Sequence, residues 1–248
     1  MRHLLLLAAL GCTACPGVKP SENPPESPLA PVEGQFGKPV MLGADVAFER
    51  DAALIRLTTD QTLELGWSAG GAESADQVAL VRDGSRWTGR LENLPKNDEG
   101  TFIARLGDGE ARQVFMLEWS HASALEDAES GVHSTDGLLQ LAFERGDLPS
   151  GVRLGVLARP ATKRGRKLVL GPYQVSATQA VHGRGVFSLP PEASGTWSRW
   201  SFATAQVLRS VDGAPFTVVP SVAHADQGLV AFTADAPASF VLSLEEVP

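Results

Sequence analysis

From Phe36 onward the chain alternates short hydrophobic runs with clusters of Gly, Pro, Asp and Asn. In the clearest run, Leu63, Leu65 and Trp67 alternate with polar or small residues, which is the period of a strand with one buried face. Turn signals such as Asp83-Gly84 separate the runs. In this half we predict strands at Ala53 to Leu57, Leu63 to Trp67, Val78 to Arg82, Arg86 to Leu91, Thr101 to Leu106 and Val114 to Trp119.

A second set of hydrophobic runs occupies the rest of the chain. Phe240, Leu242 and Leu244 share one face of the last run, and Asp212-Gly213 marks a tight hairpin. Many short strands at this spacing favour an antiparallel sandwich or barrel, and we predict sandwiches. The strands predicted here are Leu138 to Phe143, Val152 to Leu157, Leu168 to Leu170, Gly185 to Leu189, Phe202 to Arg209, Phe216 to Val219, Leu229 to Phe232 and Phe240 to Leu244.

The predicted fold class is therefore all-β, with two tandem antiparallel β-sandwich domains over residues 36–120 and 137–248. Residues 121–136 between them are small and polar, and we expect a linker there. The roughly 210 residues of the two halves are enough for two domains of ordinary size. The halves share no repeat of fixed period.

A proline-rich segment precedes the first predicted sandwich. Its prolines lie among Ser, Glu, Gly and Asn, and it contains almost no large hydrophobic residue. Such a composition cannot bury enough surface to offset chain entropy, and the prolines keep the backbone extended. We expect residues 12–35 to be a disordered spacer.

The first residues have the pattern of an export signal. Arg2 precedes an apolar run from Leu4 to Leu10, and Gly11 follows it. The run is shorter than the roughly 20 residues that span a bilayer, so we predict a removable signal over residues 1–11. An ordinary secretory signal with incidental cysteines is the alternative.

The small residue before Cys12 makes this segment resemble a bacterial lipoprotein signal. In that family the cysteine receives diacylglycerol and becomes the acylated amino terminus. The resemblance implies lipidation at Cys12, with Cys15 as the second candidate, although Ala9 stands where the family prefers a branched aliphatic residue. Thr13, in place of an Asp after the cysteine, resembles lipoproteins of the outer membrane.

Charge and cysteine content narrow the possible partners. The net charge of -8 argues against nucleic acid, whose binding needs basic patches. Both cysteines lie at the amino end, so we expect no disulfide in the folded part. Four of the five residues Lys163, Arg164, Gly165, Arg166 and Lys167 are basic, and we predict a hairpin tip there. That tip is either a solvated edge or a contact with anionic lipid or polysaccharide.

Two further resemblances concern the predicted sandwiches. Leu63 to Trp67, Val81 to Gly84 and Trp87 to Pro95 resemble bacterial immunoglobulin-like and fibronectin type III-like modules. Gly171 to Leu244, with its Gly171-Pro172-Tyr173 start, resembles the β-sandwich module of ankyrins and netrin receptors. Similar modules accompany cell-wall peptidases of the lysostaphin type, but the zinc motifs His-x-x-x-Asp and His-x-His do not occur in this chain.

Few residues offer catalytic chemistry. Gly66 to Gly70 matches the G-x-S-x-G nucleophile elbow around Ser68, but only seven residues separate it from the next predicted strand, too few for the helix that the elbow requires. The histidines of the predicted mature chain are scattered, and we expect neither a metal nor a cofactor. They are His121, His133, His182 and His224. Trp197, Arg199 and Trp200 either belong to the core or face a sugar or protein.

These observations predict a non-catalytic lipoprotein of the bacterial cell envelope, displayed from the membrane as a binding or structural module. Its expected partners are the membrane, through the lipid anchor, and an envelope protein or polysaccharide. The alternatives are an envelope serine hydrolase that uses Ser68 and an accessory subunit of a cell-wall enzyme.

Overall fold

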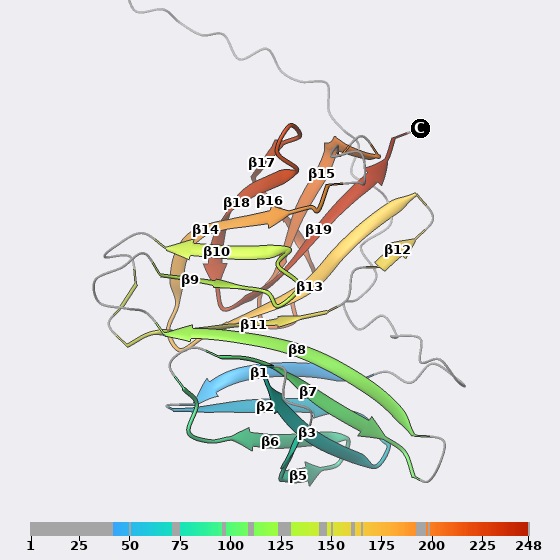
Figure 1. Cartoon of the computed structure of the whole chain (residues 1–248), viewed down its shortest axis with the longest axis vertical. Helices are drawn as coiled ribbons and strands as arrows, with labels where there is room; N and C mark the ends of the chain where they lie inside the picture. The colour runs from blue at the N-terminus through green and yellow to red at the C-terminus, as the bar shows by residue number, and fades with distance from the viewer. Residues whose placement is uncertain are drawn as a thin grey trace, which may run out of the picture.

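The computed structural model describes residues 42–49, 51–70, 75–95, 98–108, 112–123, 130–143, 148–149, 151–159, 162–164, 166–191, 197 and 199–247. All regular structure in these ranges is β-strand, which confirms the all-β prediction (Figure 1). The leader, the spacer, Cys12 and Cys15 lie outside the described residues. Within the described part, no helix has the length and hydrophobic character needed to cross a bilayer.

The strands form one long central sheet and two smaller sheets, and every strand pairing is antiparallel. The central sheet has the order β16 (Thr217–Val219), β15 (Trp200–Ser210), β19 (Ala238–Glu246), β13 (Lys167–Ala177), β11 (Arg153–Ala158), β8 (Gln113–Ser123), β7 (Asp98–Leu106), β3 (Leu63–Ala69) and β4 (Asp76–Val78), and β12 (Thr162–Arg164) pairs with β13. The amino-terminal sheet has the order β1 (Gly43–Glu49), β2 (Ala52–Thr58), β6 (Arg86–Leu91) and β5 (Leu80–Asp83). The carboxy-terminal sheet has the order β17 (Ser221–His224), β18 (Leu229–Ala236), β14 (Val181–Ser188), β10 (Leu139–Phe143) and β9 (Ser130–His133).

The two smaller sheets cover opposite faces of the central sheet at its two ends. This follows from β11, whose consecutive side chains point to opposite faces. Leu157 belongs to the hydrophobic core under the amino-terminal sheet, and Val156 to the core under the carboxy-terminal sheet. Each predicted half thus contributes most of one core, while the sheet between them is continuous. The division into two separately folding domains stays a prediction.

The core under the amino-terminal sheet is built around Trp119, which is fully buried. The rings of Trp67 and Phe102 lie 5.9 Å from it, and the ring of Phe48 lies 5.7 Å from it, measured between centroids. Gly100 makes this packing possible, because a Cβ atom there would lie 2.4 Å from the Trp67 ring. Burial of aromatic side chains at this density is a main source of stability in a sandwich.

The core under the carboxy-terminal sheet is also aromatic. Phe187 lies between Tyr173 and Phe232, at ring-centroid distances of 5.7 Å and 5.5 Å. Phe240 of β19 lies 5.1 Å from Phe232. The predicted shared face of Phe240, Leu242 and Leu244 is confirmed, since all three are fully buried in this core.

The structure corrects two features of the predicted strands. The run Val78 to Arg82 is not one strand, because the chain passes at Ala79 from β4 in the central sheet to β5 in the amino-terminal sheet. Part of the predicted linker 121–136 is also strand, formed by the end of β8 and by β9. β1, β12 and β17 are further strands that the hydrophobic pattern does not predict.

Two predicted turns are confirmed. Asp212 and Gly213 both have positive φ angles, 51° and 75°, and the Ala214 N–H donates to the Val211 carbonyl over 2.9 Å. This turn joins β15 to β16, although β16 begins only at Thr217. β12 and β13 pair around residues 165 and 166, so the basic cluster lies at a hairpin tip.

Candidate functional site

The central sheet has one bare stretch beside the edge of the carboxy-terminal sheet. The carboxy-terminal sheet packs on one face of the central sheet, over β11, β13, β19 and β15. The same face continues across β8, β7 and β3, and beyond the contacts of β9 with β8 and β7 no described strand covers it. Edge strand β9 borders this bare stretch, as Figure 1 shows, with β9 running above β8. The bare stretch and β9 therefore form two sides of one corner, and we call the bare stretch of the central sheet the floor and the side formed by β9 the wall.

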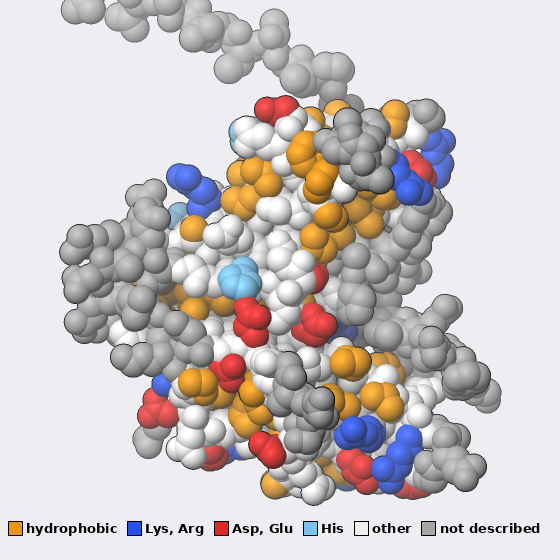
Figure 2. Space-filling view, viewed as in Figure 1, with side chains coloured by type: hydrophobic (Ala, Val, Ile, Leu, Met, Phe, Trp, Pro, Cys, Tyr) orange, Lys and Arg blue, Asp and Glu red, His pale blue; other side chains and the backbone are white. Residues whose placement is uncertain are grey.

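The floor is defined by the strand register. Met116 of β8 lies opposite Ile103 of β7, and Ile103 lies opposite Gly66 of β3. Val114 and Met116 are 57% and 61% exposed, unusually high for hydrophobic side chains in the interior of a sheet. Figure 2 shows hydrophobic side chains gathered over β8, next to acidic and histidine side chains.

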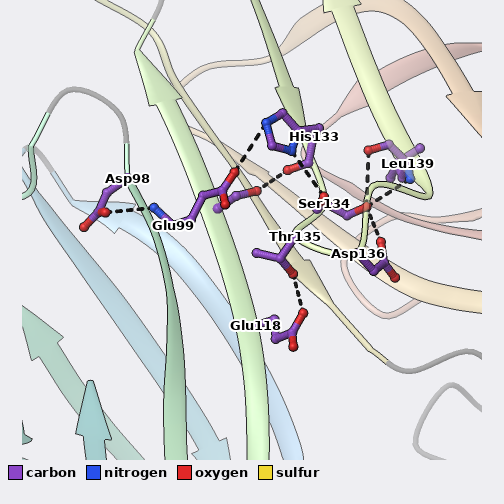
Figure 3. Close-up of polar contacts among 9 residues, drawn as sticks. Asp98, Glu99, Glu118, His133, Ser134, Thr135, Asp136 and Leu139 are labelled. Carbon is purple, nitrogen blue, oxygen red and sulfur yellow. Dashed lines mark hydrogen bonds and ion pairs between the residues drawn. The ribbon is translucent and has the colours of Figure 1, made fainter. Parts of the chain in front are cut away.

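The wall is polar and is fastened to the floor by side-chain contacts (Figure 3). His133 Nε2 of β9 lies 3.3 Å from Glu99 Oε1 of β7. The Thr135 hydroxyl donates to Glu118 Oε2 of β8 over 2.6 Å, and the Ser120 hydroxyl donates to the His133 carbonyl. We call the whole surface the ledge: its floor is Ile103, Val114 and Met116, its wall is His133 and Thr135, and Glu99 and Glu118 lie where floor and wall meet.

Behind the wall, a buried turn holds the chain between β9 and β10. Ser134 is fully buried, accepts the Leu139 N–H over 2.9 Å and donates to Asp136 Oδ1 over 2.6 Å. The hydroxyl of buried Tyr173 donates to Asp136 Oδ2 over 2.8 Å. Burial and the neighbouring Asp136 carboxylate both raise the pKa of Tyr173. The tyrosine therefore stays protonated and acts as a fixed donor that positions the turn.

The ledge is acidic where it meets β9, whereas at its other end Arg105 of β7 lies opposite Val114 of β8. The carboxylates of Glu99 and Glu118 lie at the junction of floor and wall, and both residues are exposed. The Thr135 hydroxyl is uncharged, so its hydrogen bond leaves the negative charge of Glu118 in place. An apolar floor beside carboxylates suits a ligand that combines hydrophobic groups with a positive charge.

Ser68 lies on the same face but does not form a nucleophile elbow. It is within β3 and opposite Thr101 of β7, which in turn lies opposite Glu118 of β8. The strand spacing of about 4.8 Å places Ser68 roughly 10 Å from Glu118 across the sheet. An elbow needs a sharp turn from a strand into a helix, whereas Ser68 has the extended backbone of a paired strand.

The predicted histidines lie apart from one another. His121 is a core residue, stacked on Trp119 at 4.7 Å, with its Nε2 atom 3.0 Å from the Pro95 carbonyl oxygen. Burial lowers its pKa, partly opposed by the Pro95 hydrogen bond. His182 contacts Asp235, which also pairs with Arg209, and His224 lies at the end of β17. Among the described side chains, no group of three His, Cys, Asp or Glu is placed to hold a metal ion.

The tryptophan cluster belongs largely to the second core. Trp197 and Trp200 both pack against that core, and Trp197 Nε1 donates to the Leu189 carbonyl over 2.9 Å. Arg199 lies over the Trp200 ring at 5.4 Å and pairs with Glu246 at 2.9 Å. The side chains of Lys163 and Arg164 lie outside the described residues.

Comparison of the chain with models of protein families, with curated proteins and with solved structures finds no match. The resemblances to lipoproteins and to the two sandwich modules stay predictions.

The sequence pattern predicts Met116 in a strand, but it does not mark Met116, Glu99 or Glu118 as functional residues. One signal could have found the ledge. The run Val114 to Leu117 is hydrophobic at every position, although a strand with one solvated face should alternate.

Proposed function

We propose that this protein is a non-catalytic binding module of the bacterial envelope, and that the ledge is its binding surface. The exposure of Met116 and Val114 on a bare sheet face, beside two fixed carboxylates, carries the proposal. Exposed hydrophobic groups rimmed by polar ones mark interaction surfaces. The floor lies on central strands of a sheet, so its shape is preformed and little ordering is needed on binding.

The ligand that fits best is a protein segment with hydrophobic residues next to Lys or Arg. Val114, Met116 and Ile103 offer aliphatic surface and a flexible thioether, which suit hydrophobic side chains. Glu99 and Glu118 suit a cation at the edge of that segment. A polysaccharide is the second candidate from the sequence, but sugar rings are commonly stacked on aromatic faces, and the ledge as defined contains none.

The rest of the proposal concerns how the folded part is attached to the membrane. Export by residues 1–11, lipidation at Cys12 and a proline-rich spacer over residues 12–35 would hold the folded part away from an outer membrane. Two or more acyl chains anchor stably, whereas one binds marginally. Palmitate labelling tests this arrangement: we expect labelling to be lost in Cys12→Ser and kept in Cys15→Ser, and labelling that persists in Cys12→Ser would contradict it.

The ledge is tested by capture of partners from detergent-solubilised envelope, with the chain as bait. We expect a specific protein to be retained by the wild type and by Val81→Lys, and lost with Met116→Lys. Val81 is the matched control because it is 72% exposed and lies on β5, in the amino-terminal sheet. Glu118→Gln should weaken capture and make it less sensitive to salt, because the variant removes one attractive charge.

The alternative functions predict different results with the same envelope preparation. Cosedimentation with purified cell-wall polysaccharide that is lost in Met116→Lys would assign the ledge to a polysaccharide. Labelling by a serine-reactive phosphonate that depends on Ser68 would support the hydrolase and contradict the proposal. Recovery of a cell-wall enzyme as the captured protein would identify the chain as its accessory subunit.

A further inference from the structure

One run of chain forms the free edge of both layers around the second core. β16 is the last strand of the central sheet, β17 is the last strand of the carboxy-terminal sheet, and only Pro220 separates them. Val218 and Val222 are 62% and 60% exposed. Unpaired backbone groups and exposed β-branched side chains together make an edge that can accept another strand.

This edge lacks the usual protection by charge. The sequence contains no Asp, Glu, Lys or Arg from Gly213 to Ala225. The pairing of β17 with β18 runs through four consecutive residue pairs without a shift, so no bulge turns the edge away. Pro220, between β16 and β17, has no backbone N–H and cannot donate a hydrogen bond to an added strand. β17 begins after it and keeps its own backbone N–H groups.

The other edge strands in the described part of the chain are charged or covered. β4 carries Asp76, β5 carries Arg82 and Asp83, and β12 carries Lys163 and Arg164. β9 packs on β8 through the contacts of the ledge wall, and β1 packs beside β13. In the described part of the chain, β16 and β17 are therefore the edge strands that are both uncharged and uncovered.

We propose that β17 is a homodimerisation edge, which pairs antiparallel with β17 of a second copy of this chain. In a two-fold antiparallel pair each residue lies opposite itself or a near neighbour from the same strand, so any charge would meet its like. β17 has no such charge. The net charge of -8 makes copies of the chain repel one another, so self-association through acidic surfaces is disfavoured. A contact between two copies is therefore most favourable along a stretch without acidic residues, such as β17.

The dimer would extend the carboxy-terminal sheet across the two-fold axis, from β9 of one copy to β9 of the other. Four residues per strand make a small contact, but attachment of both copies to one membrane would raise their effective concentration. The inference does not depend on the ledge, because β9, the strand that borders the ledge, is at the opposite edge of the carboxy-terminal sheet from β17.

Sedimentation of the full chain, extracted from the envelope in detergent, tests the proposal. We expect the wild type and Val81→Lys to sediment with twice the protein mass of one chain, and Val222→Lys with one. A monomeric wild type at concentrations up to about 100 μM would overturn the proposal. A dimer that persists in Val222→Lys would also overturn it, because the contact would then lie elsewhere. Far-UV circular dichroism should be unchanged in both variants, since both side chains are exposed.

Cross-linking in intact cells provides a second measurement that does not require extraction. Val222→Cys or Ala223→Cys should give an oxidant-dependent dimer, because cysteines on directly paired strands lie within the Cα separation that a disulfide spans. Val81→Cys and the parent chain, which retains Cys12 and Cys15, are the controls. Equal cross-linking in all four chains would contradict pairing through β17.

Discussion

Val156 and Leu157 are neighbours in β11, and their side chains enter two different hydrophobic cores on opposite faces of one sheet. Both are fully buried. The amino-terminal sheet also contacts strands of the second half, since Gln174 of β13 accepts the Val46 N–H over 3.1 Å and Arg153 of β11 pairs with Asp51 at 3.0 Å. The two cores are therefore linked through shared strands as well as through chain connectivity.

This linkage predicts one cooperative unfolding transition. Leu154 and Leu157 lie on opposite faces of β11 and form a matched pair of probes, because each is buried in a different core. We expect Leu154→Ala and Leu157→Ala each to lower the free energy of unfolding by about 2–5 kcal/mol. Both should shift the same transition in urea, followed by tryptophan fluorescence and by far-UV circular dichroism.

Two separable transitions, each moved by only one of these variants, would contradict the shared-sheet account. Such a result would instead support two independent domains. Val81→Ala serves as the control, since an exposed position should change the free energy of unfolding by less than about 0.5 kcal/mol.

The buried His121 predicts a loss of stability in mild acid. Burial lowers its pKa below the usual 6.5 in the folded chain, and the charge of Arg153 also acts in that direction, while the Pro95 hydrogen bond and Asp98 oppose it. The unfolded chain therefore binds a proton more strongly, so this residue makes the free energy of unfolding fall as the pH drops below about 6.5.

The size of this effect is bounded at about 1.4 kcal/mol for each pH unit between the unfolded and the folded pKa. Thermal unfolding from pH 7.5 to pH 5 should show a smaller decline for His121→Phe than for the wild type. Val81→Ala, at an exposed position of β5, should keep the wild-type decline. An unchanged slope in His121→Phe would show that His121 is not the group responsible.

Gly100 predicts a steric requirement in the first core. A Cβ atom at this position would lie 2.4 Å from two atoms of the Trp67 ring, so Gly100→Ala must displace the ring or the strand. We expect a loss of about 1–3 kcal/mol in the free energy of unfolding and a change in tryptophan fluorescence. Gly70→Ala is the matched control, because its nearest neighbour outside the adjacent chain, the Glu99 carbonyl oxygen, lies 3.6 Å away. Equal stability of the two variants would contradict the close packing.

The strands could be predicted from local patterns, but the way they assemble could not. Leu63, Leu65 and Trp67 alternate with polar or small residues, and they are buried as expected. In contrast, no residue in the run Val78 to Arg82 indicates that the strand breaks at Ala79 and that the chain passes there from one sheet to another. The small polar residues 121–136 favoured a linker, whereas tertiary contacts hold His121 and the backbone of His133 in strands.

The ledge could not be predicted from local sequence patterns for a related reason. Val114 and Met116 belong to a run that is hydrophobic on both faces, which normally indicates a strand buried on both sides. Only the continuity of the central sheet, and the end of the carboxy-terminal sheet at β9, leave one of those faces bare. Glu99, Glu118 and His133 come from the consecutive strands β7, β8 and β9, but β9 belongs to a different sheet, so their proximity depends on how the two sheets pack.

We propose that the ledge binds a protein in the envelope, and photocross-linking in living cells is the decisive measurement. A benzophenone side chain at Met116 should give a discrete adduct with another protein, and the same group at Val81, which is even more exposed, should not. Glu118→Gln should reduce the yield of that adduct. An adduct pattern at Met116 identical to that at Val81 would contradict specific binding of a protein at the ledge.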